Sequence, residues 1–238
     1  MTLPIDRPAL HQRLAAILPS HCLVENVEAQ RPFECDALTL YHELPLLVAL
    51  PETVGQTQAV LRCCHEMGVP VVARGSGTGL CAGAMPHPEG VLLGLSKLDQ
   101  ILDIDPQART ARLQPGVTNL AISEAAAPHG LYYAPDPSSQ IACSIGGNVA
   151  ENSGGVHCLK YGLTTHNLLS LELLTVEGAR LTIGGPGLDS PGLDLMALIT
   201  GSEGLLGIVV EVTVKLLPLP EMARVILAGF DSVRDAGD

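Results

Sequence analysis

The stretch "VVARGSGTGLCAG", residues 71–83, joins an apolar run to a loop in which every second residue from 75 to 79 is glycine. Glycine adopts backbone angles closed to other residues and lets a ligand approach the main chain, at a cost in ordering entropy. Consecutive N–H groups in such a loop can converge on an anion. The pattern predicts a strand that ends in an anion-binding loop, with a plain flexible turn as the alternative.

The segments before this loop predict a parallel βαβ unit. Residues 44–53 read as an apolar strand, residues 53–68 as a helix that begins at a threonine cap and ends at glycine, and residues 69–73 as a second strand. Parallel strands place a ligand site at their carboxyl ends, where the glycine-rich loop begins. A short amphipathic helix is expected earlier, over residues 7–18.

The rest of the chain predicts a larger lobe built on a mixed or antiparallel sheet. A hairpin is expected over residues 168–185, with its turn at Glu177 and Gly178. The other expected elements are short strands over 91–95, 101–105 and 109–114, a helix over 119–130, and a half-buried strand over 208–218. The fold class is therefore α+β, with a small βαβ lobe over residues 41–100 and a larger lobe over residues 101–220.

Three further glycine-bearing loops follow, at residues 114–118, 133–155 and 200–208. A structureless segment as long as 133–155 inside a compact domain usually has a function, although Asn and Gly also form ordinary turns. If this segment turns helically, Asn148 and Asn152 share a face and offer their amides together. The first of the three, taken alone, is an ordinary Pro-Gly turn. Together the loops indicate one extended ligand, such as a large, flat cofactor.

The charge balance excludes several partners. Lys and Arg number 13 against 25 Asp and Glu, for a formal charge of −12, and no basic cluster occurs. We therefore expect neither nucleic acid nor an anionic membrane surface as a partner. No apolar run reaches the ~18 residues of a membrane span, and the N-terminus does not read as a signal peptide. Any phosphate must then be held mainly by backbone N–H groups.

Other motifs match poorly. The loop approaches a dinucleotide fingerprint, but residues 84–90 break the helix that such a site requires, and no Gly-Lys-Ser/Thr follows for a P-loop. Histidines such as His129, His157 and His166 lack metal-ligand spacing, so no metal site is expected. The seven cysteines are scattered, which predicts reduced thiols in a cytoplasmic protein and no iron–sulfur cluster in this chain.

Three long segments carry a family resemblance. They are "VVARGSGTGLCAGAMP" (71–86), "YYAPDPSSQIACSIGGNVAENSGGVHCLKYGLTTHNLL" (132–169) and "LITGSEGLLGIVVEVTVKLLPLP" (198–220). Together they resemble the FAD-binding half of the vanillyl-alcohol-oxidase, or PCMH-type, flavoprotein family, and within it the FAD-linked subunits of bacterial glycolate oxidases (glycolate dehydrogenases). The resemblance implies a PCMH-type FAD-binding domain over residues 41–220. Residues 1–40 would form a helix and lead-in, and residues 221–238 would begin a C-terminal cap domain that this chain lacks.

The resemblance also implies which residues contact FAD. Covalent members of the family often carry a histidine where this chain has Thr78-Gly79-Leu80, so noncovalent FAD is expected. Cys81 and Cys143 are alternative tethers, but each is expected to be a buried free thiol. The implied cofactor-binding residues are Arg74, Gly75, Ser76, Gly77, Thr78, Gly79, Gly116, Val117, Pro135, Asp136, Ser138, Ser139, Ser144, Ile145, Gly146, Gly147, Asn148, Ala150, Asn152, Glu203, Gly204, Gly207 and Ile208.

The activity implied by the resemblance is oxidation of a small 2-hydroxy acid, such as glycolate or D-lactate, with hydride passing to the flavin. Electrons would leave through a second FAD-binding-type subunit and an iron–sulfur subunit, in the cytoplasm or at the inner membrane through these partners. The catalytic residues are expected in the missing cap, although His157, Lys160 and Tyr161 can face the flavin. The alternatives are a noncatalytic nucleotide-binding or assembly module, a dehydrogenase for another 2-hydroxy acid, and a flavin reductase of cell-wall sugar-nucleotide synthesis.

Overall fold

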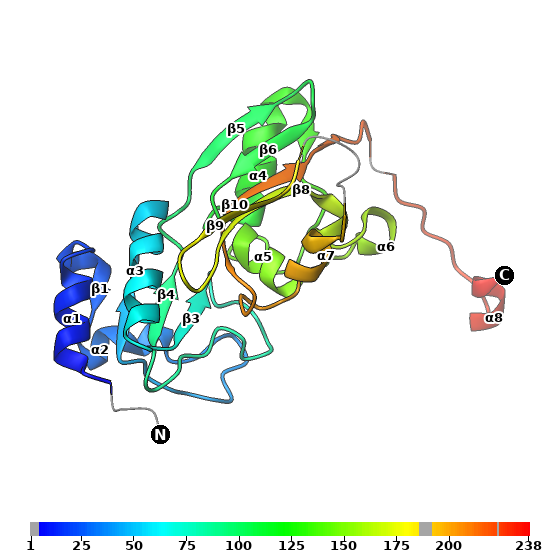
Figure 1. Ribbon diagram of the computed structural model, residues 1–238. Helices are drawn as coiled ribbons and strands as arrows, with labels where there is room; N and C mark the ends of the chain where they lie inside the picture. Colours follow the sequence, from blue (N-terminus) through cyan, green and yellow to red (C-terminus); the bar gives the residue numbers. More distant parts are fainter. Residues whose placement is uncertain (1–4, 186–191, 223) are drawn as a thin grey trace.

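The computed structural model describes residues 5–185, 192–222 and 224–238, which form two lobes, each built on its own sheet (Figure 1). The smaller sheet has the order β1-β2-β4-β3, with β1 at Leu23–Val24, β2 at Leu47–Ala49, β4 at Val91–Gly94 and β3 at Val71–Arg74. Both β2 and β3 pair parallel with β4. The predicted parallel arrangement is confirmed, but β4 lies between the two strands of the predicted unit.

Helices of the small lobe pack on this sheet for reasons visible in the sequence. Helix α3 (Val54–Glu66) begins where the Thr53 hydroxyl accepts a hydrogen bond from the N–H of Gln56 at 3.1 Å. Helix α1 (Arg7–Ala15) packs against α3 and buries Leu10 and Leu14 completely. These leucines belong to the small lobe's core, although they precede residue 41. The domain boundaries remain a prediction.

The larger lobe is a five-stranded antiparallel sheet in the order β5-β6-β10-β8-β9. Its strands are β5 (Ile101–Asp105), β6 (Thr110–Leu113), β10 (Ile208–Lys215), β8 (Leu168–Leu174) and β9 (Arg180–Gly184). The predicted hairpin is confirmed, because β8 pairs antiparallel with β9 around a turn at Gly178, whose φ is +75°. Helices α4 (Asn119–Ala126) and α5 (Ile145–Glu151) contribute apolar side chains to this sheet's core.

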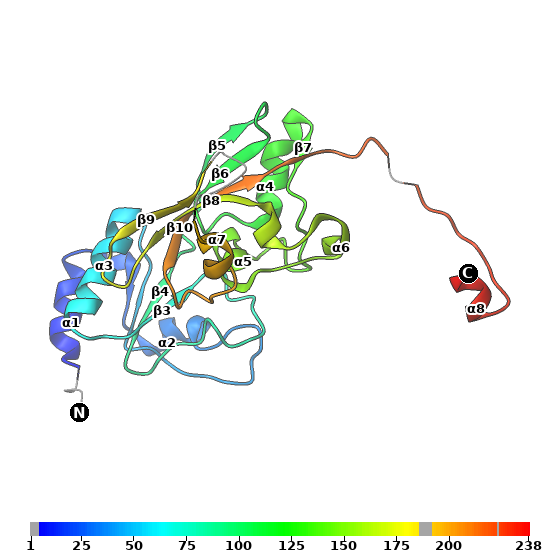
Figure 2. The ribbon, with the colours of Figure 1, turned by 45° about the vertical axis from the view of Figure 1, so that its right-hand side comes forward.

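Short elements complete the chain. A β-bridge pair joins β7 (Leu131–Tyr132) to β11 (Leu217–Pro218). The other short elements are α2 (Val27–Gln30), α6 (Cys158–Tyr161), α7 (Leu195–Ile199), α8 (Val233–Gly237), and the 3-10 turns Ser20–Cys22, Arg31–Phe33, Ala127–His129 and Thr164–Asn167. The sequence did not predict the short helices, because so few residues carry no helical periodicity. Residues 224–238 extend away from the body (Figure 2).

The two lobes share an apolar junction. Leu174, Ile208 and Val210 of the large sheet belong to the core of the small lobe. Helix α3 also reaches the β8–β9 turn, where the Gln58 side-chain amide donates to the carbonyl of Gly178 at 2.7 Å. The carboxyl end of β3 is thereby held beside α5 and the start of β10. No helix within the described ranges is long and apolar enough to span a membrane.

We expect Leu171→Ala to lower the free energy of unfolding by about 2–5 kcal/mol. Leu171 of β8 is fully buried in the core between the large sheet and the helices that cover it. The control is Leu181→Ala on the neighbouring strand β9, where the side chain is 47% exposed. Urea unfolding of both variants measures the difference. Equal losses at the two positions would contradict the assignment of the buried face.

Candidate functional site

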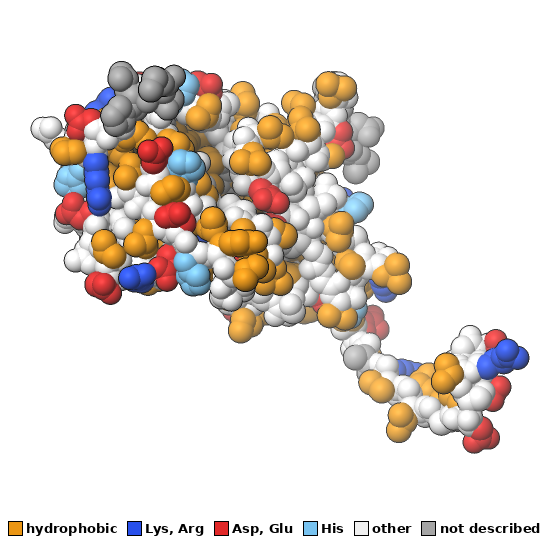
Figure 3. Space-filling view, turned by 90° about the horizontal axis from the view of Figure 1, so that it is seen from below, with side chains coloured by type: hydrophobic (Ala, Val, Ile, Leu, Met, Phe, Trp, Pro, Cys, Tyr) orange, Lys and Arg blue, Asp and Glu red, His pale blue; other side chains and the backbone are white. Residues whose placement is uncertain are grey.

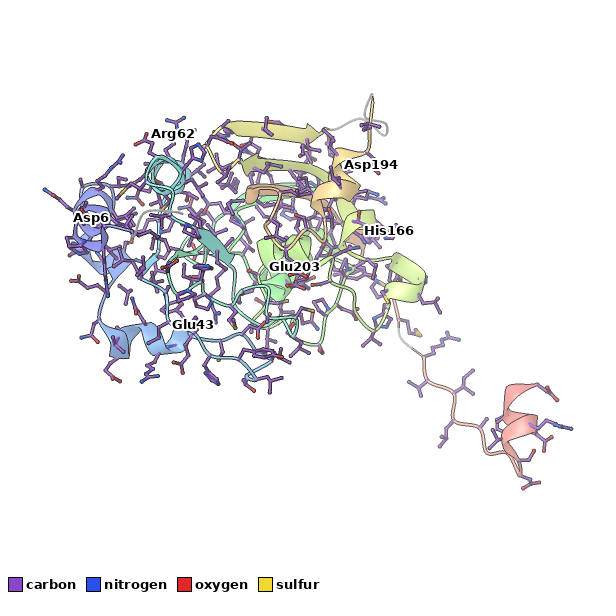
Figure 4. The ribbon with its side chains drawn as sticks, turned by 60° about the horizontal axis from the view of Figure 1, so that its bottom comes forward. Asp6, Glu43, Arg62, His166, Asp194 and Glu203 are labelled. Carbon is purple, nitrogen blue, oxygen red and sulfur yellow. The ribbon has the colours of Figure 1, made fainter. Side chains whose placement is uncertain are left out.

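A cleft between the lobes gathers the glycine-bearing loops. It consists of two adjoining hollows of about 490 Å³ and about 880 Å³, both open to solvent. The hollows share Ala73, Gly75, Gly147, Ala150 and Glu203 in their walls. In Figure 4 the residue Glu203 lies beside α5, between the two lobes. Segments distant in sequence therefore form one continuous cleft, as an extended ligand requires.

The glycine loop, which we define as residues 75–84, carries unpaired N–H donors in the wall of this cleft. Among the described residues, the N–H groups of residues 76–81 find no hydrogen-bond acceptor, whereas the N–H of Ala82 donates to Asp36 at 2.8 Å. Residues 76–80 line the larger hollow. Gly77 has a φ of +70°, which favours glycine. A run of unpaired N–H groups beside open space suits an anion such as phosphate.

Gly75 brings the loop against the start of α5. A Cβ at position 75 would lie 2.5 Å from the Ser144 hydroxyl and 3.5 Å from the backbone of Gly147. Ser144 also caps α5, because its hydroxyl accepts from the N–H of Gly147 at 3.4 Å. Only glycine at position 75 allows this approach of the two lobes.

Arg74 braces the glycine loop through one nitrogen of its guanidinium, Nη1. Its guanidinium donates to the carbonyls of Cys35 at 2.8 Å and Ala84 at 3.3 Å and lies 5.9 Å from the centre of the Phe33 ring. Burial lowers the pKa of Arg74 from its ordinary value. Its other guanidinium nitrogens lie against Gly77, where a Cβ would collide with Nη2, and Arg74 is itself part of the cleft lining.

Two carboxylates stand in the cleft wall. Glu151 and Glu203 both line the larger hollow, and ideal Cβ positions at Gly79 and Gly83 lie 3.3 Å from Glu151 Oε1 and 2.6 Å from Glu203 Oε2. Burial raises the pKa of Glu151 above its ordinary value, and the charges of Glu203 and Asp36 add to this effect. Because these carboxylates lie against Gly79 and Gly83, they repel an anion from that end of the glycine loop.

A buried amide network supports helix α5, which carries Asn148 in the cleft wall. The Asn148 amide donates to the side chain of Asn119 at 2.9 Å, and the Asn119 amide donates to the carbonyl of Pro135 at 2.9 Å. Asn152 ends α5 with a φ of +52°, and its side-chain oxygen accepts from the N–H of Thr165 at 3.1 Å. The two asparagines therefore do not present their amides together. The left-handed residue at 152 turns the second one away.

The structure places most of the predicted cofactor-binding residues in the lining of the two hollows. Those in the lining are Arg74, Gly75, Ser76, Gly77, Thr78, Gly79, Ser139, Ser144, Gly146, Gly147, Asn148, Ala150, Glu203, Gly204, Gly207 and Ile208. Those outside it are Gly116, Val117, Pro135, Asp136, Ser138, Ile145 and Asn152. Gly116 packs instead, because a Cβ there would lie 2.7 Å from the carbonyl of Leu98.

Sequence reasoning missed several lining residues. Pro115 lies beside the predicted residue Gly116, and Glu151 lies within the predicted loop over residues 133–155. The predictions for neighbouring residues therefore already indicated both positions. Ile199 and Val209 line the smaller hollow as apolar residues, which no motif distinguishes from ordinary core residues. Asn119 was missed as well. Its signal was a polar residue at the start of a helix whose inward face is otherwise apolar.

The residues expected to face a flavin from helix α6 form a separate cluster, and none of them lines either hollow. His157 Nδ1 lies 2.6 Å from a carboxylate oxygen of Asp136. Tyr161 packs edge-on against Tyr132, with the Lys160 ammonium 5.0 Å from the Tyr161 ring centre. Hydrogen bonds with Tyr132 and Lys160 lower the pKa of Tyr161.

Among the cysteines, Cys143 is buried as expected, but Cys81 is exposed, so the expectation of a buried thiol at Cys81 is wrong. The left-handed turn at Ala82 and the glycines around it hold that part of the loop at the surface.

Figure 3 shows hydrophobic side chains distributed over the face seen from below. Exposed Leu80 and Ile141 come from two of the loops that carry lining residues.

A second group of ligand-type side chains lies outside the lining of the two hollows. Potential metal-ligand atoms of His21, Cys22 and Glu52 lie within 4.8 Å of one another. The Lys97 ammonium already contacts this group, 3.2 Å from Cys22 Sγ and 2.9 Å from Glu52 Oε1. Its hydrogen bond and that of His21 lower the pKa of Glu52 to about 2. Lysine thus supplies the positive charge at this cluster.

An α+β fold with a long, glycine-lined cleft between two lobes defines a dinucleotide-binding protein of the PCMH type. The model of the FAD-binding domain family matches residues 45–184, more than half of the chain. The chain belongs to this family. FAD is accordingly its cofactor, and the free N–H groups of the glycine loop and the glycine-only approach at position 75 fit the phosphates and the main-chain proximity of such a ligand.

Relatives extend the comparison. The chain is 60% identical over 233 residues to the glycolate oxidase subunit GlcD of Escherichia coli K12, covering 98% of this chain and 47% of that protein. It is 42% identical to GlcD of Bacillus subtilis, covering 84% and 43%, and 36% identical to a D-lactate dehydrogenase of Archaeoglobus fulgidus, covering 80% and 43%. The chain spans about half the length of these curated relatives.

Solved structures confirm the fold. An alkyldihydroxyacetonephosphate synthase superposes with a TM-score of 0.81 at 22% identity, covering 93% of this chain and 42% of that one. A variant of Phl p 4, a glucose oxidase, superposes with a TM-score of 0.74 at 21% identity, covering 89% and 44%. The predicted PCMH-type α+β fold is confirmed.

We expect Gly75→Ala to weaken FAD binding about 10-fold or more, because the added methyl group would force the glycine loop away from Ser144 and α5. Quenching of flavin fluorescence on titration measures the affinity. The matched control is Gly185→Ala, where no atom of the described residues lies within 4 Å of the added carbon. An unchanged affinity in the position-75 variant would contradict the placement of FAD against this loop.

We expect Glu151→Gln to stabilise the protein at pH 7 and to have no such effect near pH 4. A carboxyl group whose pKa is raised by folding contributes stability below its unfolded pKa of about 4.3 and loses it as the pH rises through the folded value. Urea unfolding at both pH values tests this, with exposed Glu124→Gln as the control. A difference independent of pH would show that Glu151 is not destabilised by burial.

Proposed function

We propose that this protein uses noncovalently bound FAD to oxidise a small 2-hydroxy acid, glycolate or D-lactate. The relatives' names support the substrate class, because they include glycolate oxidase subunits and D-lactate dehydrogenases. The observation that carries the proposal is the row of N–H groups at residues 76–81, which find no acceptor among the described residues and of which residues 76–80 line a cleft assembled from both lobes.

The proposed division of work within the site follows from the contacts. Residues 76–79 hold the pyrophosphate by backbone N–H groups, and the segment from Ser139 to Ala150 together with residues 203–208 encloses the rest of FAD. The remaining residues implied by the resemblance, which lie outside the lining, act by positioning these segments. Bound FAD supplies the acceptor for the two electrons and the hydrogen taken from the substrate.

Residues of this chain shield the site rather than perform the acid–base step, in our proposal. Among the described residues, the lining combines small apolar residues such as Ala73 and Ala150 with main-chain groups, and its one basic side chain, Arg74, donates through Nη1 to two carbonyls. The groups that bind the substrate carboxylate and take its hydroxyl proton therefore belong to the part of the longer relatives that this chain does not match.

We further propose that electrons leave through partner subunits, one of them an iron–sulfur protein and one a second FAD-binding-type subunit. The name of the E. coli relative describes a subunit, which supports an assembly. All seven cysteines of this chain are free and scattered, so these residues do not supply a cluster, and we assign it to a partner subunit. The proposed place is the cytoplasm, with contact to the inner membrane through the partners.

The full gene product, purified with its accompanying subunits, should be yellow and release FAD on heating. Anaerobic addition of glycolate or D-lactate should bleach the flavin absorbance, whereas acetate, which lacks the hydroxyl group, should not. A colourless protein that takes up no added FAD would exclude the flavoprotein. A yellow protein that no 2-hydroxy acid bleaches would favour a noncatalytic nucleotide-binding module.

A further inference from the structure

A short segment that precedes the FAD-domain match contacts the glycine loop from outside the cleft. We define residues 33–37 as the strap. The carbonyl of Cys35 accepts from the Arg74 guanidinium at 2.8 Å, and the N–H of Ala37 donates to the carbonyl of Gly79 at 3.1 Å. The family model begins only at residue 45. The strap thus lies outside the residues that the family model matches and contacts the glycine loop within them.

Asp36 makes the most specific of these contacts. Its side chain is buried, with 6% of the residue exposed, and both carboxylate oxygens are used. One accepts from the N–H of Leu38, the residue after the strap, at 2.9 Å, and the other accepts from the N–H of Ala82 in the glycine loop at 2.8 Å. A buried carboxylate held by two N–H groups is fixed in place, and it joins two segments far apart in sequence.

The glycine loop needs such a support because its own backbone does not stabilise it. Residues 76–81 leave their N–H groups without acceptors among the described residues, and Ala82 has a φ of +62°, an unfavourable angle for a residue with a side chain. The hydrogen bond from Ala82 to Asp36 offsets this strain.

We propose that Asp36 is a positioning residue for FAD, acting through Ala82 to hold the glycine loop ready for the cofactor's phosphates. The inference rests on the proposed FAD site at this loop. Both oxygens of Asp36 are occupied by N–H groups, so the carboxylate serves the loop and does not itself bind the ligand. Preorganisation of this kind appears as affinity, because the ordering cost is met before FAD arrives.

The test compares Asp36→Ala and Asp36→Asn with the matched controls Glu34→Ala and Glu34→Gln. Glu34 lies in the same strap, but its carboxylate pairs with Arg31 and His42 instead of the loop. Amide hydrogen exchange of residues 75–84 in the FAD-free protein reports loop order, and flavin fluorescence titration reports affinity. We expect Asp36→Ala to speed exchange at Ala82 and to weaken FAD binding by about 10- to 100-fold. Asp36→Asn, which keeps one acceptor oxygen, should recover part of both effects.

The outcomes separate this inference from the proposed function. Faster exchange with weaker FAD binding in Asp36→Ala, partial recovery in Asp36→Asn and wild-type behaviour of both Glu34 variants would support it. Faster exchange with unchanged FAD affinity would overturn it while leaving the FAD site intact. Equal weakening by the Glu34 variants would also overturn it, because the effect would then belong to the strap's charge. If the parent protein bound no FAD, the proposed function itself would fail.

Discussion

The site depends on the close approach of the two lobes at Gly75. There the glycine loop lies against the Ser144 cap of α5, and a Cβ at position 75 would collide with the Ser144 hydroxyl. The approach is possible because Leu174, Ile208 and Val210 of the large sheet are buried in the core of the small lobe, which fixes the carboxyl end of β3 beside α5. Apolar burial thereby sets the geometry, and the glycine leaves room for it. A cleft with walls from both lobes results.

Electrostatics then decides where in the cleft an anion can lie. The chain is acidic overall, Arg74 is engaged by carbonyls, and Glu151 and Glu203 stand in the wall. On the loop side, the backbone N–H groups therefore provide the positive dipole ends that an anion can contact. Such dipoles can hold phosphate without a cation, and the nearby carboxylates limit the orientations that a phosphate-containing ligand can take.

The loop that carries these donors is supported from outside by residues that no motif marks. Arg74 and Asp36 are both polar and buried, and both bond to main-chain groups. Arg74 donates to the carbonyls of Cys35 and Ala84, and Asp36 accepts from the N–H groups of Leu38 and Ala82. Buried polar groups that are fully hydrogen-bonded define a single arrangement, because any other arrangement leaves one of them unpaired. The same logic holds for Asn119 and Asn148 on the opposite wall.

The sequence by itself determined the elements with strong local signals. The apolar strands and glycine stops predicted the parallel strands of the small lobe and the hairpin over 168–185, and the motifs around residues 75 and 144–150 predicted most of the cleft lining. Only the tertiary structure decided that β4 lies between β2 and β3, that Arg74 faces inward, and that Asn152 turns away from Asn148. Contacts between segments distant in the chain decide the strand order, the partners of a buried charge and the left-handed end of a helix. Local patterns do not record such contacts.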